Sequence, residues 1–247
     1  MRRRLSLGGV PILRRARDRF CAGAAARCGG RIGIFVRALT DSDAFIQAWT
    51  SARARRMPFD VAIDLLDGSH RCATDRDATD ARLFHQRYLP KLRLVVVGGD
   101  PVTLALCAFA PMFDYEVVLL RPYGPTAPPP RTTLAHYDPR PLARALDALA
   151  LDPFTAVYTL THDMDDDHAV LEKALASDAF SAGALGSRSK SAEREHRLRI
   201  AGFDDAALRR LHSPAGVSIN AREPREIALA VLAETVALWP RAQSATQ

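Results

Sequence analysis

The sequence contains few lysines, few cysteines and no long apolar run. Three of its 34 basic residues are Lys, and its four Cys are scattered with no Cys-x-x-Cys pair. This scatter gives no sign of a disulfide framework or a zinc knuckle, so we expect a protein of the reducing cytoplasm. No apolar run approaches the roughly 18 residues that cross a bilayer, so we expect no membrane segment.

Beyond residue 40 the chain also lacks a net positive charge. Residues 1–40 contain ten Arg and one acid, Asp18, and carry a net charge of +9, whereas the other residues carry 24 basic and 27 acidic groups, a net charge of −3. A domain that binds nucleic acid carries its basic patch on the folded body. We therefore expect no nucleic-acid partner. The short apolar stretch 5–13 leads into further Arg rather than a cleavage site, which is unlike a secretory signal.

The first 90 residues predict a small α+β segment. Residues 31–39 are rich in β-branched and aromatic residues and predict a strand. Asp41 or Ser42 is placed to cap a helix that continues to Arg55. A second strand is expected over 59–66, before a turn at Asp67-Gly68, and residues 69–85 are expected to form loop or edge structure.

A stronger pattern begins at Lys91. Residues 92–97 are almost wholly apolar, which indicates a strand buried on both faces. A helical apolar run over 102–111 and a second buried strand over 115–120 follow. Such a β-α-β unit builds a parallel sheet.

The alternation of strands and helices continues to residue 239. A Pro-rich loop is expected first, at 121–138. Strands are then expected at 155–160 and 181–185, and helices at 142–151, 165–177, 189–200 (ended by Gly202), 205–211 (capped by Asp204) and 224–239 (followed by Pro240). We therefore predict an α/β fold: a Rossmann-like, doubly wound parallel sheet over 91–247, preceded by a smaller, partial α+β segment over 1–90.

Ligands of open parallel sheets bind at the carboxyl ends of the strands. The first such end is Gly98-Gly99-Asp100-Pro-Val-Thr103, in which Asp100 and Thr103 occupy the second and third glycine places of a dinucleotide fingerprint. Arg121 follows the second strand, where an NAD enzyme has Asp or Glu, and an arginine there suits a 2′-phosphate. These residues leave two interpretations: an altered NAD(P) site, or a Rossmann turn that packs its helix and binds nothing.

The third strand ends at Thr161-His162-Asp163, followed by Asp165, Asp166, Asp167 and His168. Acids at a helix start satisfy free N–H groups and the helix dipole, which is the interpretation we favour. A metal site at His162, Asp163 and His168 is the alternative, although their spacing matches no zinc motif.

The fourth strand ends at Gly186-Ser187-Arg188-Ser189-Lys190. Small residues that enter a helix and are followed by two cations favour an anion cradle, and an ordinary β-α turn is the alternative.

Two single residues complete the candidates. Glu234 is the only charged residue between Ile227 and Trp239, and we expect a satisfied core or interface acid rather than a catalytic base. Cys28 lies among Arg27, Gly29 and Gly30, where neighbouring cations favour a thiolate that binds soft metals.

Several segments together resemble the XdhC/CoxI-type family of molybdenum cofactor accessory proteins. The resemblance covers roughly residues 91–239, and Cys28-Gly29-Gly30 is similar to the segment that ends the family's N-terminal domain. Its segments are Leu-Val-Val-Val-Gly-Gly (94–99), Leu-Thr-His-Asp (160–163), Gly183-Ala-Leu-Gly-Ser-Arg188 with Lys190, Ala-Gly-Phe (201–203), Leu-His-Ser-Pro-x-Gly (211–216) and Pro224-x-Glu-Ile-Ala228 with Glu234.

The resemblance implies a chaperone without a catalytic cycle. Such proteins bind molybdopterin as cargo, hold it while a cysteine desulfurase supplies a sulfido ligand, and deliver it to an apo molybdenum hydroxylase of the xanthine dehydrogenase type. A homodimer is compatible with the sequence. The candidate cofactor-binding residues are Cys28, Gly98, Gly99, Asp100, Arg121, Thr161, His162, Asp163, Gly186, Ser187, Arg188, Lys190 and His212, with Cys28 as a candidate molybdenum ligand.

The chain departs from the family pattern in its first loop. The usual Gly-Ala-Gly-His-Val-Gly is Gly98-Gly-Asp-Pro-Val-Thr103 here, and Arg121 replaces the acid after the second strand. The upstream family segments are absent, so residues 1–90 are interpreted as a remnant of the N-terminal domain. Two other functions stay open: an NAD(P)-dependent oxidoreductase, and a scaffold of a hydroxylase complex that binds no cofactor.

Overall fold

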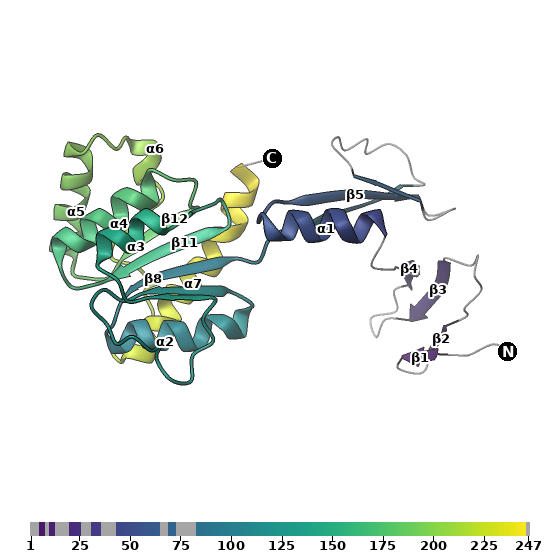
Figure 1. The fold of residues 1–247 in the computed structure, drawn as a ribbon, viewed down its shortest axis with the longest axis horizontal. Coiled ribbons are helices and arrows are strands. Elements are labelled where there is room, and N and C mark those ends of the chain that lie inside the picture. Colours follow the sequence, from purple (N-terminus) through teal and green to yellow (C-terminus); the bar gives the residue numbers. More distant parts are fainter. Residues whose placement is uncertain are drawn as a thin grey trace. The chain divides into compact units, whose positions relative to one another are not determined.

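The structure is a computed structural model that describes residues 43–64, 69–72 and 83–245, together with the backbone of strands β1 to β4 between residues 5 and 35. The candidate Cys28 and the expected turn at Asp67-Gly68 lie outside the described residues. The chain divides into two compact units, residues 1–90 and 91–247, which are described separately (Figure 1).

The first unit contains three small antiparallel sheets and one helix. Strand β1 pairs with β2, β3 pairs with β4, and β5 lies between β6 and β7. Their bounds are β1 Leu5–Leu7, β2 Val10–Ile12, β3 Phe20–Ala25, β4 Arg31–Phe35, α1 Ala44–Ala54, β5 Phe59–Asp64, β6 His70–Cys72 and β7 Leu83–Tyr88. Helix α1 packs Phe45 and Ala52 against Phe59 and Val61 of β5 in a small core.

One prediction for this unit is wrong and another is confirmed. Helix α1 is capped by Asp43, whose carboxylate accepts the Phe45 N–H at 2.9 Å, and not by Asp41 or Ser42. Any of the three side chains can cap a helix, so the sequence alone does not choose among them. Strands β6 and β7 confirm the edge structure expected near 69–85, since they lie on either side of β5.

The second unit is built on a parallel sheet with the strand order β10-β9-β8-β11-β12-β13. In chain order this is 3-2-1-4-5-6, the arrangement of the doubly wound dinucleotide-binding folds. The strands are β8 Arg93–Gly98, β9 Glu116–Leu120, β10 His136–Asp138, β11 Thr155–Leu160, β12 Ser181–Ala184 and β13 Leu211–His212. The predicted Rossmann-like sheet is confirmed.

Helices cover both faces of this sheet (Figure 1). They are α2 Pro101–Phe109, the 3₁₀ turn η1 Ala110–Phe113, α3 Leu142–Ala148, α4 Met164–Leu175, α5 Arg188–Ile200, α6 Asp205–Leu208 and α7 Pro224–Ala245. Alternate residues of β8 point to opposite faces. Val95 and Val97 pack in the core that holds α3, α4 and α5, whereas Leu94 and Val96 pack in the core that holds α2 and α7.

Three boundaries in this unit were predicted wrongly. Residues 136–138 form β10 rather than loop, and Leu211–His212 form β13 rather than the end of a helix. Strands this short carry no readable periodicity, because tertiary pairing creates them. Helix α7 continues through Pro240 to Ala245, since proline removes a single helical hydrogen bond and does not always end a helix. No helix among the described residues is long and apolar enough to cross a bilayer.

Candidate functional site

The chain reverses its direction of winding between the neighbouring strands β8 and β11. Loops that leave two such strands diverge to opposite faces of the sheet, and ligands of this fold class bind there. The structure brings two sequence candidates together at this point: the imidazole Nε2 of His162 lies 3.0 Å from Oδ2 of Asp100. The His162 side chain is 68% exposed and that of Asp100 is 16% exposed.

Asp100 is the N-cap of α2. Its Oδ1 accepts the backbone N–H of Thr103 at 2.7 Å and the Thr103 hydroxyl at 2.6 Å. The first residue of the helix, Pro101, has no N–H. Both carboxylate oxygens of Asp100 therefore have partners, and the positive end of α2 already faces a negative charge.

Arg121, at the end of β9, lies against the same loop. Its Nη2 is 3.5 Å from the Gly99 carbonyl oxygen, and a Cβ on Gly99 would lie 2.7 Å from Arg121 Nε. Gly98 packs closely against β11, because a Cβ there would come within 2.7 Å of the Leu160 carbonyl oxygen. The two glycines thus leave room for neighbouring groups of the protein itself.

Asp163 is the N-cap of α4, which confirms the capping interpretation. Its Oδ1 accepts the N–H groups of Asp165 and Asp166 at 2.9 and 3.0 Å, and these bonds hold the pKa of Asp163 below its usual range. Burial and the neighbouring carboxylates raise the pKa of Asp166. His162 contacts Asp100, and His168 contacts Glu172 at 3.3 Å, so the three suggested metal ligands have different partners. The described residues contain no group of three such side chains that could hold a metal ion.

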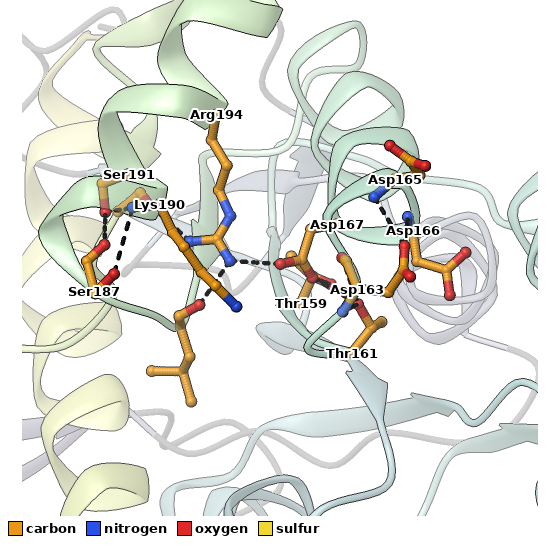
Figure 2. Close-up of polar contacts among 12 residues, drawn as sticks. Thr159, Thr161, Asp163, Asp165, Asp166, Asp167, Ser187, Lys190, Ser191 and Arg194 are labelled. Carbon is orange, nitrogen blue, oxygen red and sulfur yellow. Dashed lines mark hydrogen bonds and ion pairs between the residues drawn. The ribbon is translucent and has the colours of Figure 1, made fainter.

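A buried ion pair that the sequence did not indicate supports this edge of the sheet (Figure 2). Arg194 of α5 donates to Asp167 of α4 at 2.5 Å, and both side chains are at most 2% exposed. The other oxygen of Asp167 accepts the hydroxyls of Thr159 and Thr161 at 2.6 and 2.8 Å. The Arg194 Nη2 also donates to the Leu185 carbonyl oxygen at 2.8 Å. The pair therefore joins the loops that follow β11 and β12.

The same arginine explains why Gly186 is present. Gly186 has φ of +150°, and a Cβ there would lie 2.9 Å from Nη1 of Arg194. Nη1 also donates to Ser213, the residue after β13, at 3.3 Å. Arg194 thus contacts Leu185 and Gly186 and holds the backbone of the candidate anion cradle in place. One weak signal could have found it: Arg194 precedes the buried Leu198 by four residues and shares its helix face.

The N-terminus of α5 remains open. Ser187 caps the helix with an uncharged hydroxyl, which lies 3.4 Å from the Lys190 N–H and 2.9 Å from the Ser189 hydroxyl. Figure 2 shows Ser187, Lys190 and Ser191 at this end of the helix. The side chains of Arg188 and Lys190 are exposed. Free N–H groups, hydroxyls and two cations together can bind a phosphate or a carboxylate.

His212 and Glu234 lie together near the α7 face of the sheet. Glu234 Oε2 accepts the Tyr158 hydroxyl at 3.3 Å, and Oε1 lies 3.9 Å from Nδ1 of His212. Burial raises the pKa of Glu234, while bonds from the Gly216 N–H and the Tyr158 hydroxyl lower it. Burial also raises the pKa of Tyr158. The prediction of a satisfied acid at Glu234 is confirmed.

Comparison with known proteins gives a consistent result. The family described as the XdhC Rossmann domain matches residues 94–235, which is more than half of the chain. Two proteins of Escherichia coli K12 are similar in sequence. The uncharacterized protein YqeB is 32% identical over 146 residues, and the molybdenum cofactor insertion chaperone PaoD is 24% identical over 213 residues.

The matches cover only part of the relatives. The aligned region spans 58% of this chain and 26% of YqeB, and 85% of this chain and 60% of PaoD. A crystal structure described as a xanthine dehydrogenase from Bacillus halodurans matches with a TM-score of 0.63 and 20% identity. That match covers 78% of this chain and 62% of the other, and it shows likeness of fold.

Proposed function

Because this chain belongs to the family of the XdhC Rossmann domain, we propose that it is a molybdenum cofactor chaperone rather than an enzyme with its own turnover. Its similarity to PaoD, which is named as an insertion chaperone for the molybdenum cofactor, supports this assignment. In this proposal the chain holds molybdopterin as cargo in the reducing cytoplasm.

The observation that carries the proposal is the open N-terminus of α5. The cargo is a phosphorylated pterin, and a phosphate is favoured where a helix presents free N–H groups beside cations. At α5 the cap is the neutral Ser187, and Arg188 and Lys190 are exposed. At α2 and α4 the caps are the carboxylates of Asp100 and Asp163, which repel a phosphate. We therefore propose that the cargo phosphate binds at Gly186, Ser187, Arg188 and Lys190.

Thr161, His162 and His212 have supporting roles in this proposal. Thr161 and His162 border the same edge of the sheet, and the imidazole of His212 faces Glu234. Cys28 is proposed as the soft ligand of molybdenum, on the cysteine chemistry of its sequence neighbourhood. A cysteine desulfurase is the proposed sulfur donor, and an apo hydroxylase of the xanthine dehydrogenase type is the proposed recipient.

Cofactor analysis tests the proposal. The full chain is expressed in cells with an intact molybdenum cofactor pathway, and molybdenum and pterin are measured in the purified protein. We expect both to co-purify, and we expect the loaded protein to raise the activity of an apo hydroxylase. In Lys190→Gln the bound pterin should fall about tenfold, because a phosphate loses a cation partner at a helix N-terminus.

Lys173→Gln is the matched control, because it removes the same charge from the last turn of α4. It should retain the cofactor content of the unmodified chain. A chain that carries no molybdenum or pterin and does not activate the hydroxylase would contradict the proposal and leave the scaffold hypothesis. Equal losses in the two variants would contradict the assignment of the phosphate to α5.

A further inference from the structure

The strand order of this domain implies a nicotinamide dinucleotide in the loop after β8, and the residues present do not fit one. A dinucleotide-binding loop of this fold uses glycines so that its backbone can approach a pyrophosphate. The pyrophosphate then accepts N–H groups at the N-terminus of the following helix. An acid after the second strand binds the ribose.

The anion position at α2 is already filled. Asp100 Oδ1 is bonded to the N–H and the hydroxyl of Thr103 at 2.7 and 2.6 Å, and Pro101 contributes no N–H. A pyrophosphate would have to displace this carboxylate or lie beside it. In either case two negative charges would compete for the same helix end.

The space beside the second glycine, which a dinucleotide would need, is filled by a side chain of the protein. The Arg121 guanidinium occupies the space beside Gly99, where a Cβ would come within 2.7 Å of Nε. Arg121 stands where an NAD enzyme has its ribose-binding acid. An arginine there would suit a 2′-phosphate, but this guanidinium is turned toward the Gly99 backbone. Arg121 donates toward the Gly99 carbonyl oxygen, next to Asp100.

A contact between Asp100 and the loop after β11, in the other half of the sheet, holds the loop after β8 in this conformation. His162, on the loop after β11, bonds the second oxygen of Asp100 at 3.0 Å. His162 has φ of +65°, an uncommon conformation for a residue with a side chain. The imidazole therefore lies across the point between β8 and β11 where a dinucleotide of this fold would cross.

We propose that Gly98–Thr103 is a self-occupied phosphate loop, in which Asp100 takes the place of the pyrophosphate, so that this Rossmann domain binds no nicotinamide dinucleotide. The inference concerns a ligand class different from the cargo proposed above and does not depend on it. It removes an oxidoreductase role for the loop, and it makes Asp100 the group that keeps the loop closed.

Two titrations of the full chain test the proposal. Calorimetry with NADH and NADPH should give no saturable heat for the unmodified protein. Inorganic pyrophosphate is then titrated while the backbone amide signals of Val102 and Thr103 are followed by NMR. In Asp100→Gly these two amides should shift with a dissociation constant about tenfold lower than in the unmodified chain, because an anion regains the helix end. The effect should weaken at high salt.

Asp163→Gly is the matched control, since it uncaps α4 in the same way. Asp165, Asp166 and Asp167 follow it, so no pyrophosphate binding should appear at that helix. Asp100→Asn keeps a capping oxygen without the charge, and it decides the question if Asp100→Gly loses cooperative unfolding. Micromolar binding of NADH or NADPH by the unmodified chain would overturn the proposal. A folded Asp100 variant that binds pyrophosphate no better than the unmodified chain would overturn the role given to Asp100.

Discussion

Two glutamates of α7 have opposite environments although they lie two turns apart. Glu234 is 13% exposed, and burial raises its pKa above the ordinary value of 4.5. Glu226 accepts the N–H groups of Arg222 and Glu223 at 2.8 and 3.1 Å, and these bonds lower its pKa below 4.5. The folded state therefore opposes the ionisation of Glu234 and favours that of Glu226.

The pH dependence of stability should separate these two residues. Glu234 is protonated in both states below pH 4.5, so its stabilising contribution is complete there and is lost as pH rises through its folded pKa. The free energy of unfolding of Glu234→Gln should therefore increase relative to the unmodified chain over that interval. Urea unfolding of both proteins between pH 4 and pH 8 measures the difference. A difference that stays constant or decreases would contradict the assigned environment of Glu234.

Glu226→Gln is the control, and its sign is opposite. The contribution of Glu226 is present above pH 4.5 and is lost as pH falls through its lowered folded pKa. This variant should therefore lose stability, relative to the unmodified chain, as pH rises from the lowered folded pKa of Glu226 to 4.5, and the difference should stay constant above 4.5. The unfolding series for this variant accordingly extends below pH 4. Two variants of one helix that shift in the same direction would show that the pH dependence arises elsewhere.

At the residue scale, sequence reasoning found groups with a local role and missed groups with distant partners. Asp163 was predicted as a cap because its hydrogen bonds reach only two and three residues along the chain. Asp167 belongs to the same acidic run, yet its partner Arg194 is 27 residues away on another helix. Spacing gives only the weak sign that Arg194 shares a helix face with the buried Leu198, and it does not identify Asp167 as the partner.

At the scale of elements, Gly186 and Gly202 test what a loop glycine contributes. Both have positive φ, of +150° and +94°, but a Cβ at Gly186 would meet Arg194 whereas a Cβ at Gly202 would meet nothing within 4 Å. Gly202→Ala should destabilise the chain by about 1 kcal/mol through backbone strain alone. Gly186→Ala should cost about 3 kcal/mol, because a buried arginine must also move.

Thermal or urea unfolding of the two variants gives the comparison. Gly186→Ala should also lower the cofactor content, because the substitution displaces the backbone next to Ser187. Gly202→Ala should leave the cofactor content unchanged. Equal losses of stability would show that Arg194 does not constrain the loop.

The elements that sequence predicted best are those buried on both faces. Leu94–Val97 is a continuous apolar run, and Thr155–Leu160 carries two threonines among apolar and aromatic residues. Every residue of both segments is buried, and both strands were placed within one or two residues. Strand β13 was missed because only its pairing with β12 makes it a strand. The end of α7 was misplaced because the helix continues through Pro240. Local pattern therefore predicted the centre of the sheet and not its edge.

At the scale of the whole molecule, the second unit contains its own core. Both apolar clusters that enclose the parallel sheet consist entirely of residues after Lys91. We expect residues 91–247, expressed alone, to unfold cooperatively on heating, because a core of this size can sustain a domain. Circular dichroism measures the transition. A fragment with a gradual, non-cooperative melt would contradict the expectation.

The contrast between α2 and α5 has a consequence for how a ligand leaves. A domain that engages a molecule through both halves of its sheet must break two sets of contacts before release. If α5 takes the phosphate as proposed, while Asp100 occupies the N-terminus of α2, a bound ligand would be held at one end and exposed at the other. Departure would then need a single rupture, and a recipient could engage the free end first. One-ended attachment of this kind favours transfer of a ligand to another protein over its permanent retention.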